Sequence, residues 1–160
     1  MISRQYLKVQ PSPLGGMGLF TTVKINARYP IIELAGDFFN LSNVPDHPAV
    51  TQIANDLFLG ASGGPDDYIN HSCNPTCYLS IMGKRAILYS LYVIPADTEL
   101  TFDYSTSSTE SMDSWKMDCS CGSFNCRKVI SGIQHLTEDQ RKSLETIGAL
   151  PAFMREKIFK

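Results

Sequence analysis

The chain has 160 residues, 43% of them hydrophobic and 19% charged, which is the composition of an ordinary folded domain. A chain of this length can bury a hydrophobic core of its own. Its formal net charge is −2, which argues against a protein that binds mainly through contacts to phosphate groups. We therefore expect one globular unit. Its small negative charge is compatible with a basic peptide as partner.

The N-terminal residues do not resemble a secretory signal, and the longest apolar run, residues 86–94, is too short and interrupted to span a bilayer. We therefore expect an intracellular protein, cytoplasmic or nuclear, without a membrane partner. In a reducing compartment, clustered cysteines more often bind a metal or act as catalytic thiols than form disulfides. The chain has five cysteines, an odd number that does not suit a closed disulfide framework.

Short β-like runs dominate the first two-thirds of the chain. Three of them, each bounded by Pro, Gly or Asn, cover residues 6–10, 29–34 and 37–41. The clearest predicted hairpin joins residues 78–82 to residues 86–93 through a tight turn at Gly83 and Lys84. Both faces of its second arm are apolar, so we expect a central, buried strand there. Residues 99–104 then alternate strictly, which is typical of a strand with one face in the core.

The last third changes character. Residues 105–114 are rich in Ser and Thr, which predicts a flexible connector. Residues 137–140 have the form of a capping box, and Gly148 fits a C-cap, so we expect a helix between them. A short second helix is predicted from Pro151, because proline suits a first helical turn.

Three cysteines, Cys119, Cys121 and Cys126, have the spacing C-x-C-x4-C. Zinc usually takes four ligands in a tetrahedron, and thiolates are common at its structural sites. A fourth ligand would have to come from elsewhere in the chain. The candidates are the remaining cysteines and the histidines: Cys73, Cys77, His47, His71 and His135. Spacing alone does not choose among these five, and a set of reduced, buried cysteines without a metal is the alternative.

Four segments resemble, in this order, the signatures of SET-domain protein lysine methyltransferases. They are Gly16-Met17-Gly18-Leu19-Phe20, Asn70-His71-Ser72-Cys73-x-Pro75, Glu99-Leu100-Thr101-Phe102-Asp103-Tyr104 and C-x-C-G-x3-C-R. Together they extend over residues 14–127, which is most of the chain. Each segment is a weak signal alone, but the four in order and with compatible spacing are specific. With a helical tail after the cysteines, the chain is similar to small stand-alone SET proteins.

The resemblance implies a mostly β fold with C-terminal helices, the SET domain or β-clip, in which the tyrosine segment passes beneath a loop as a pseudoknot. Composition would not suggest this topology, because threading is rare in proteins. The implied division is a SET domain at 1–104, the connector at 105–114, a post-SET zinc segment at 115–130 and a helical tail at 131–160. We expect these parts to form one globular unit.

The resemblance also implies an answer for the metal. In SET proteins with a post-SET segment, the cysteine of the NHSC motif completes the zinc tetrahedron. The implied ligands are Cys73, Cys119, Cys121 and Cys126, which leaves Cys77 as a structural thiol. Four thiolates leave no open position, so the ion would be structural and would clamp the C-terminal segment over the cofactor and lysine sites.

The activity that the resemblance implies is methyl transfer from S-adenosylmethionine to the ε-amine of a lysine in a protein substrate, possibly a histone. Tyr104 occupies the position of the catalytic tyrosine, and Phe102 lies where SET enzymes carry Phe or Tyr. Phenylalanine at that position implies room for di- or trimethylation. Periodicity alone would favour core packing for both residues, and the motif around them reverses that interpretation.

Seven residues fall where the family contacts the cofactor: Gly16, Met17, Gly18, Tyr68, Asn70, His71 and Ile130. Three others depart from the family pattern. Asp67 stands where many members have arginine, Thr76 replaces an asparagine, and Lys128 replaces a common glycine. Asp67 and Thr76 keep open a SET-like module that binds peptide or cofactor with little or no catalysis, whereas the intact Tyr104, Asn70 and His71 argue against it. A zinc-knuckle scaffold for nucleic acid is disfavoured by the acidic balance, so we expect no direct nucleic-acid partner.

Overall fold

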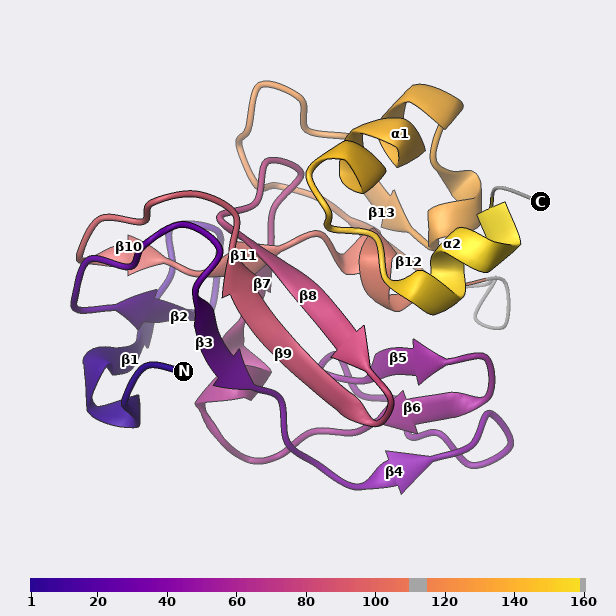
Figure 1. The fold of residues 1–160 in the computed structure, drawn as a ribbon, viewed down its shortest axis with the longest axis horizontal. Helices are drawn as coiled ribbons and strands as arrows, with labels where there is room; N and C mark the ends of the chain where they lie inside the picture. Colours follow the sequence, from indigo (N-terminus) through magenta and orange to yellow (C-terminus); the bar gives the residue numbers. More distant parts are fainter. Residues whose placement is uncertain (110–114, 159–160) are drawn as a thin grey trace.

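The computed structural model describes residues 1–109 and 115–158. This part of the chain is mostly β, with short helices near the C-terminus, as the sequence predicts (Figure 1). Its strands are β1 (Leu7–Pro11), β2 (Met17–Thr21), β3 (Pro30–Glu33), β4 (Phe38–Phe39), β5 (Thr51–Ala54), β6 (Leu57–Leu59), β7 (Asn70–His71), β8 (Cys77–Met82), β9 (Arg85–Ser90), β10 (Thr98–Glu99), β11 (Thr101–Phe102), β12 (Lys116–Asp118) and β13 (Val129–Ser131). The helices are α1 (Glu138–Thr146) and α2 (Ala152–Ile158), with 3-10 turns η1 (Arg4–Tyr6), η2 (Pro65–Tyr68), η3 (Tyr104–Ser107) and η5 (Ile133–His135).

The strands form small sheets rather than one large one. Three sheets have three strands each, in the orders β1-β2-β10, β3-β9-β8 and β4-β6-β5, and the pairs β7/β11 and β12/β13 complete the set in the described residues. The predicted hairpin is confirmed as β8 and β9, which pair from Cys77↔Ser90 to Met82↔Arg85. Gly83 makes its turn with a φ of 60°. As expected, β9 is central and its middle is buried.

The pairing of β7 with β11 brings two distant motifs together. These strands run parallel, with Asn70 opposite Thr101 and Phe102 opposite His71. The NHSC segment therefore lies directly beside the tyrosine segment. Parallel pairing needs a long connection between the strands, and here β8, β9 and β10 supply it.

The first half of the expected connector is packed rather than loose. Residues 105–109 are all buried, and the Asp103 carboxylate accepts a hydrogen bond from the Ser105 N–H at 3.1 Å to begin η3. The buried Gln52 amide oxygen accepts from both the N–H and the hydroxyl of Thr109, at 2.8 and 2.9 Å. These bonds fasten the segment to β5. The rest of the predicted connector, residues 110–114, lies outside the described residues.

The tail forms a second apolar cluster beside the β8–β9 hairpin (Figure 1). The predicted capping box of α1 is present, with hydrogen bonds in both directions between Thr137 and Gln140. Arg28 joins the tail to the domain, because it donates to the Ile147 carbonyl at 2.7 Å while its guanidinium lies 5.2 Å from the centre of the Tyr78 ring. No helix among the described residues has the length and apolar character needed to cross a membrane.

Candidate functional site

The glycine segment of β2 lies against Asn70 and Glu99. The Asn70 side-chain amide donates to the Met17 carbonyl at 2.9 Å and to the Glu99 carboxylate at 2.7 Å. The Ser12 hydroxyl lies 2.8 and 2.9 Å from the two oxygens of the same carboxylate. A Cβ on Gly18 would overlap Glu99 Oε1, so any larger residue here would have to displace the Glu99 side chain.

The other residues expected at the cofactor site occupy contrasting environments. Met17 and Tyr68 are each 42% exposed, so their apolar side chains are open to a ligand. His71 is buried, and Ile130 is buried against the cysteine cluster. Gly16 has a φ of 64°, a conformation that favours glycine. The structure therefore joins Met17 to Asn70 by a direct bond and places Ile130 with the thiols.

Tyr104 is held at both ends. Its hydroxyl donates to the Ile69 carbonyl at 2.7 Å, and its backbone N–H donates to His71 Nδ1 at 3.1 Å. Its ring centre lies 4.9 Å from that of Phe102. Burial raises the pKa of the Tyr104 hydroxyl and the charge of Glu99 raises it further, so the phenol stays neutral at physiological pH. The hydroxyl is thus a fixed group with lone pairs left to accept a hydrogen bond.

A cavity of about 570 Å³ opens in front of this pair. Phe102 and Tyr104 line one part of it, and Trp115 and residues 44–51 line others. Trp115 also packs against the cysteine cluster, so it contacts two functional regions. The sequence motifs did not identify Trp115, because it stands outside all four segments; its being the only tryptophan was the one available signal.

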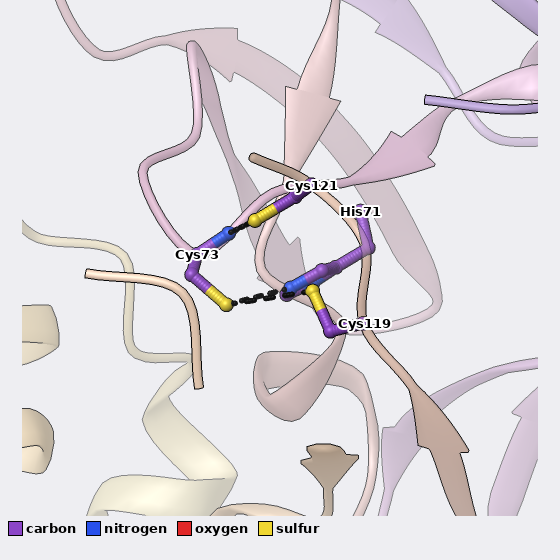
Figure 2. Close-up of side chains that lie close together, drawn as sticks. All are labelled: His71, Cys73, Cys119 and Cys121. Atoms are coloured by element: carbon purple, nitrogen blue, oxygen red, sulfur yellow. Dashed lines mark hydrogen bonds between the residues drawn. The ribbon is translucent and has the colours of Figure 1, made fainter. Parts of the chain in front are cut away.

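Three of the predicted metal ligands converge in space. The sulfurs of Cys73, Cys119 and Cys121 and a ring nitrogen of His71 all lie within 4.8 Å of one another (Figure 2). Cys73 Sγ is 3.8 Å from Cys119 Sγ, and Cys126 Sγ is 3.6 Å from Cys119 Sγ. Four sulfurs that hold zinc at about 2.3 Å in a tetrahedron are roughly 3.8 Å apart, so these spacings suit the ion.

Backbone donors around the sulfurs favour thiolates. The Arg127 N–H donates to Cys73 Sγ at 3.4 Å, and the Cys73 N–H donates to Cys121 Sγ at 3.5 Å. Burial raises the pKa of the Cys119 thiol to about 12, so a cation has to compensate the charge before all the sulfurs ionise together. All five cysteines are free of disulfides.

The hydrogen bonds of His71 indicate which of its ring nitrogens carries the proton. Burial lowers the pKa of His71 to about 4, so the ring is neutral at physiological pH. Because Nδ1 accepts the Tyr104 N–H, the proton of the neutral ring resides on Nε2. This Nε2 lies 3.2 Å from Cys73 Sγ, where it donates to the sulfur. A protonated nitrogen cannot also bind a metal.

Arg127, next to the last cysteine, ties the metal segment to the tyrosine segment. Its guanidinium donates to both oxygens of Asp103, at 2.8 and 2.6 Å, and to the Ser105 hydroxyl at 3.2 Å. The Arg127 and Asp103 side chains are 12% and 3% exposed. A charge pair this well shielded fixes one segment relative to the other.

Two of the three departures from the family pattern form hydrogen bonds near the site, and the third, Lys128, adopts a conformation that favours the usual residue. Lys128 has a φ of 65°, a conformation that favours the glycine common at this position. The Thr76 hydroxyl donates to the Glu99 carbonyl at 3.1 Å and accepts the Thr101 N–H at 2.9 Å, so it joins the strands beside the site. Asp67 accepts two backbone N–H groups in the loop before η2 and lines the cavity.

A family model for the SET domain matches residues 16–105, which is more than half of the chain. The chain therefore belongs to the SET domain family, as its motifs indicate. The match contains the glycine segment, the NHSC segment and Tyr104. The cysteine segment lies beyond it.

Curated relatives are much longer proteins. Histone-lysine N-methyltransferase trithorax of Drosophila virilis is 32% identical over an alignment 145 residues long, which covers 80% of this chain and 4% of that protein. Histone-lysine N-methyltransferase 2D of Homo sapiens is 29% identical over an alignment 133 residues long, which covers 73% of this chain and 2% of that protein. The chain thus spans only a small part of the length of either relative.

Two solved structures have the same fold. KRYPTONITE in complex with mCHG DNA and SAH aligns with a TM-score of 0.64 and 27% identity, over 77% of this chain and 28% of that one. KRYPTONITE with mCHH DNA, an H3(1-15) peptide and SAH aligns with a TM-score of 0.64 and 26% identity, over 78% and 29%. Because DNA is present in both complexes, the expectation of no direct nucleic-acid partner has no support.

Proposed function

We propose that this chain transfers a methyl group from S-adenosylmethionine to the ε-amine of a lysine in a protein substrate. The observation that carries the proposal is the placement of Tyr104, whose hydroxyl is fixed on the Ile69 carbonyl at 2.7 Å and which lines the cavity together with Phe102. The SAH in the KRYPTONITE complexes and the names of the curated relatives support it.

The amine must lose a proton before it can attack. A free lysine has a pKa near 10.4, so nearly all of it is charged at neutral pH. The apolar walls at Phe102, Tyr104 and Trp115 disfavour the charged form and lower that pKa. The Tyr104 hydroxyl then accepts a hydrogen bond from the neutral amine and orients its lone pair. Tyr104 acts by position rather than as a base, and alignment of this kind supplies a large part of the acceleration.

The cofactor, when bound, supplies an electrophilic methyl group on a sulfonium. The residues that would hold it are Gly16, Met17, Gly18, Tyr68, Asn70, His71 and Ile130. The pair Met17 and Tyr68 offers exposed apolar surface beside the polar Asn70, which fits a ligand with both apolar and charged parts.

For zinc we propose Cys73, Cys119, Cys121 and Cys126 as the ligands. The spacing of the sulfurs supports this set, and His71 is better used as a donor to Cys73 than as a fourth ligand. The ion would be structural, because four thiolates fill the tetrahedron. It would hold Trp115 at the edge of the cavity.

Phe102 is proposed to permit more than one methyl transfer. Its ring has no hydroxyl to retain a water molecule where added methyl groups need space. Phe102→Tyr should shift the products toward monomethyl-lysine in mass spectra of a methylated peptide. An unchanged distribution of products would count against this role.

The central test is calorimetric titration of the zinc-loaded protein with S-adenosylmethionine, followed by a methylation assay on histone-derived peptides. We expect stoichiometric binding that Asn70→Ala abolishes and turnover that Tyr104→Phe greatly reduces while cofactor binding persists. Thermal melts of both variants check that they fold. Binding without turnover on any peptide would favour a non-catalytic SET module, and no binding by the folded protein would refute the proposal.

A further inference from the structure

The side-chain amide of Asn70 uses its donor capacity inside the protein. Its nitrogen donates to the Met17 carbonyl at 2.9 Å and to Oε1 of Glu99 at 2.7 Å. An amide has two N–H donors and an oxygen with two lone pairs, so the remaining capacity of Asn70 is on Oδ1. In the described part of the chain, no hydrogen bond to this oxygen is present. A ligand beside Asn70 therefore meets an acceptor and not a donor.

Glu99 decides which way this amide faces. An ionised carboxylate and a backbone carbonyl can only accept, so both partners of Asn70 require its nitrogen on their side. A flipped amide would bring Oδ1 against the Glu99 carboxylate, where two acceptors repel each other. It would also lose a hydrogen bond to a charged group, which is stronger than one between neutral groups. The orientation of Asn70 therefore depends more on Glu99 than on the Met17 carbonyl.

Glu99 is itself held in place from two sides. The Ser12 hydroxyl lies 2.8 and 2.9 Å from its two carboxylate oxygens. The Leu14 N–H donates to the same hydroxyl at 2.9 Å, which ties Ser12 to the turn between β1 and β2. On the other side, a Cβ on Gly18 would overlap Oε1 of Glu99 and lie 3.0 Å from Asn70 Nδ2. The β1–β2 turn, β7 and β10 thus meet at one carboxylate and one amide.

The charge of Glu99 is not cancelled by a neighbouring side chain. Its partners Ser12 and Asn70 are neutral, and it forms no ion pair with another described residue. The charge also acts at the proposed catalytic tyrosine: burial raises the pKa of the Tyr104 hydroxyl, and Glu99 raises it further. A negative charge beside Asn70 favours a cationic donor over a neutral one at Oδ1.

We propose that Glu99, held by Ser12, is a positioning residue that fixes the Asn70 amide so that Oδ1 accepts a hydrogen bond from the α-ammonium group of S-adenosylmethionine. The inference rests on the proposed function and adds two residues to its cofactor site. The amino-acid part of this cofactor carries an ammonium group, which only donates, and a carboxylate, which only accepts. Because both donors of Asn70 are used, its side chain binds the ammonium group and not the carboxylate.

The test compares the affinities of two ligands for the zinc-loaded protein by calorimetry. One is S-adenosylhomocysteine, which keeps the α-ammonium group, and the other is its analogue with hydrogen in place of that group. We expect the wild type to bind S-adenosylhomocysteine at least about tenfold more tightly than the analogue, the value of a hydrogen bond to a charged group. In Glu99→Ala this ratio of affinities should fall toward one, while the affinity for the analogue changes little.

Two further variants and a control separate positioning from a merely structural role. Glu99→Gln keeps an oxygen for the Asn70 N–H but not the charge, so its ratio should lie between those of the wild type and Glu99→Ala. Ser12→Ala should also lower the ratio, because it frees the Glu99 carboxylate. Glu33→Ala removes a carboxylate of β3 that pairs with Arg85, and it should leave the ratio unchanged.

Thermal melts check that each variant folds, and Glu99→Gln, which keeps the shape of the side chain, carries the test if Glu99→Ala does not. An unchanged ratio, or an equal loss of affinity for both ligands, would overturn the inference and leave the proposed function standing. A wild-type ratio near one would have the same meaning. If the wild type binds neither ligand and methylates no peptide, the proposed function and the inference fail together.

Discussion

Replacement of Arg127 by methionine should strongly destabilise the protein. The guanidinium makes two hydrogen bonds to Asp103, at 2.8 and 2.6 Å, and one to the Ser105 hydroxyl at 3.2 Å. With side-chain exposures of 12% and 3%, water cannot replace these partners easily. Methionine keeps much of the side-chain length, but it leaves the Asp103 carboxylate buried without its cation.

The expected loss follows from two independent considerations. Removal of one member of a buried ion pair reduces stability by about 3–5 kcal/mol. Two charge-assisted hydrogen bonds at about 1.5–3 kcal/mol each give a similar range. Because domains have a free energy of unfolding of about 5–15 kcal/mol, Arg127→Met should remain folded but near its limit. Arg127→Lys should lose less stability than Arg127→Met, because lysine keeps the positive charge but cannot make the two parallel hydrogen bonds of the guanidinium.

Urea unfolding at constant zinc concentration measures the effect, with the fluorescence of Trp115, the only tryptophan, as one probe and circular dichroism as another. A double-mutant cycle with Asp103→Asn isolates the coupling between the two side chains. We expect a coupling energy of at least about 1 kcal/mol. If the free energy of unfolding of Arg127→Met lies within about 1 kcal/mol of the wild-type value, the pair does not hold the segments together. The same conclusion follows if the effects of the two substitutions on this free energy are additive.

Three further changes test separate parts of the structure. Lys128→Gly should stabilise the protein by about 1 kcal/mol in urea unfolding, because φ is 65° at this residue, and a loss of stability would contradict that reasoning. Gly18→Ala should weaken S-adenosylmethionine binding at least about tenfold in calorimetry, since the new methyl group displaces Glu99; unchanged affinity would show that this contact does not shape the site. Elemental analysis should find about one zinc ion per chain in the wild type; Cys126→Ala should lose this zinc, whereas Cys77→Ala should retain it, and equal zinc contents in the two variants would exclude Cys126 as a ligand.

The motifs mark residues that lie close together in the structure, but they do not mark the residues around them. Tyr104, Phe102, Asn70 and the cysteines could be recognised because each belongs to a short segment in which residue type and spacing are both constrained. Their meeting in space depends on the parallel pairing of β7 with β11. Alternation and turn residues predict local strands and hairpins, but they say nothing about which distant strands pair.

The residues that line the cavity could not be predicted from the sequence, for a different reason. Trp115, Asp66 and Ser108 become neighbours of one cavity only after the chain has folded, and no local pattern marks them. The composition of the Ser/Thr-rich segment is typical of connectors and predicts a flexible segment. Residues 105–109 are nevertheless buried, and Asp103 and Gln52 accept hydrogen bonds from the Ser105 and Thr109 N–H groups at the two ends of this segment. Composition does not show which polar groups will find partners inside.

The bond from the Tyr104 hydroxyl to the Ile69 carbonyl joins residues 35 positions apart in sequence. Contacts of this range form only after a long loop has closed, and chains that depend on them fold slowly. The proposed methyl-transfer site should therefore assemble late in folding, after the β8–β9 hairpin that lies within the loop. Activity recovered during refolding would then lag behind the recovery of β structure, and a partly folded chain would have no working site.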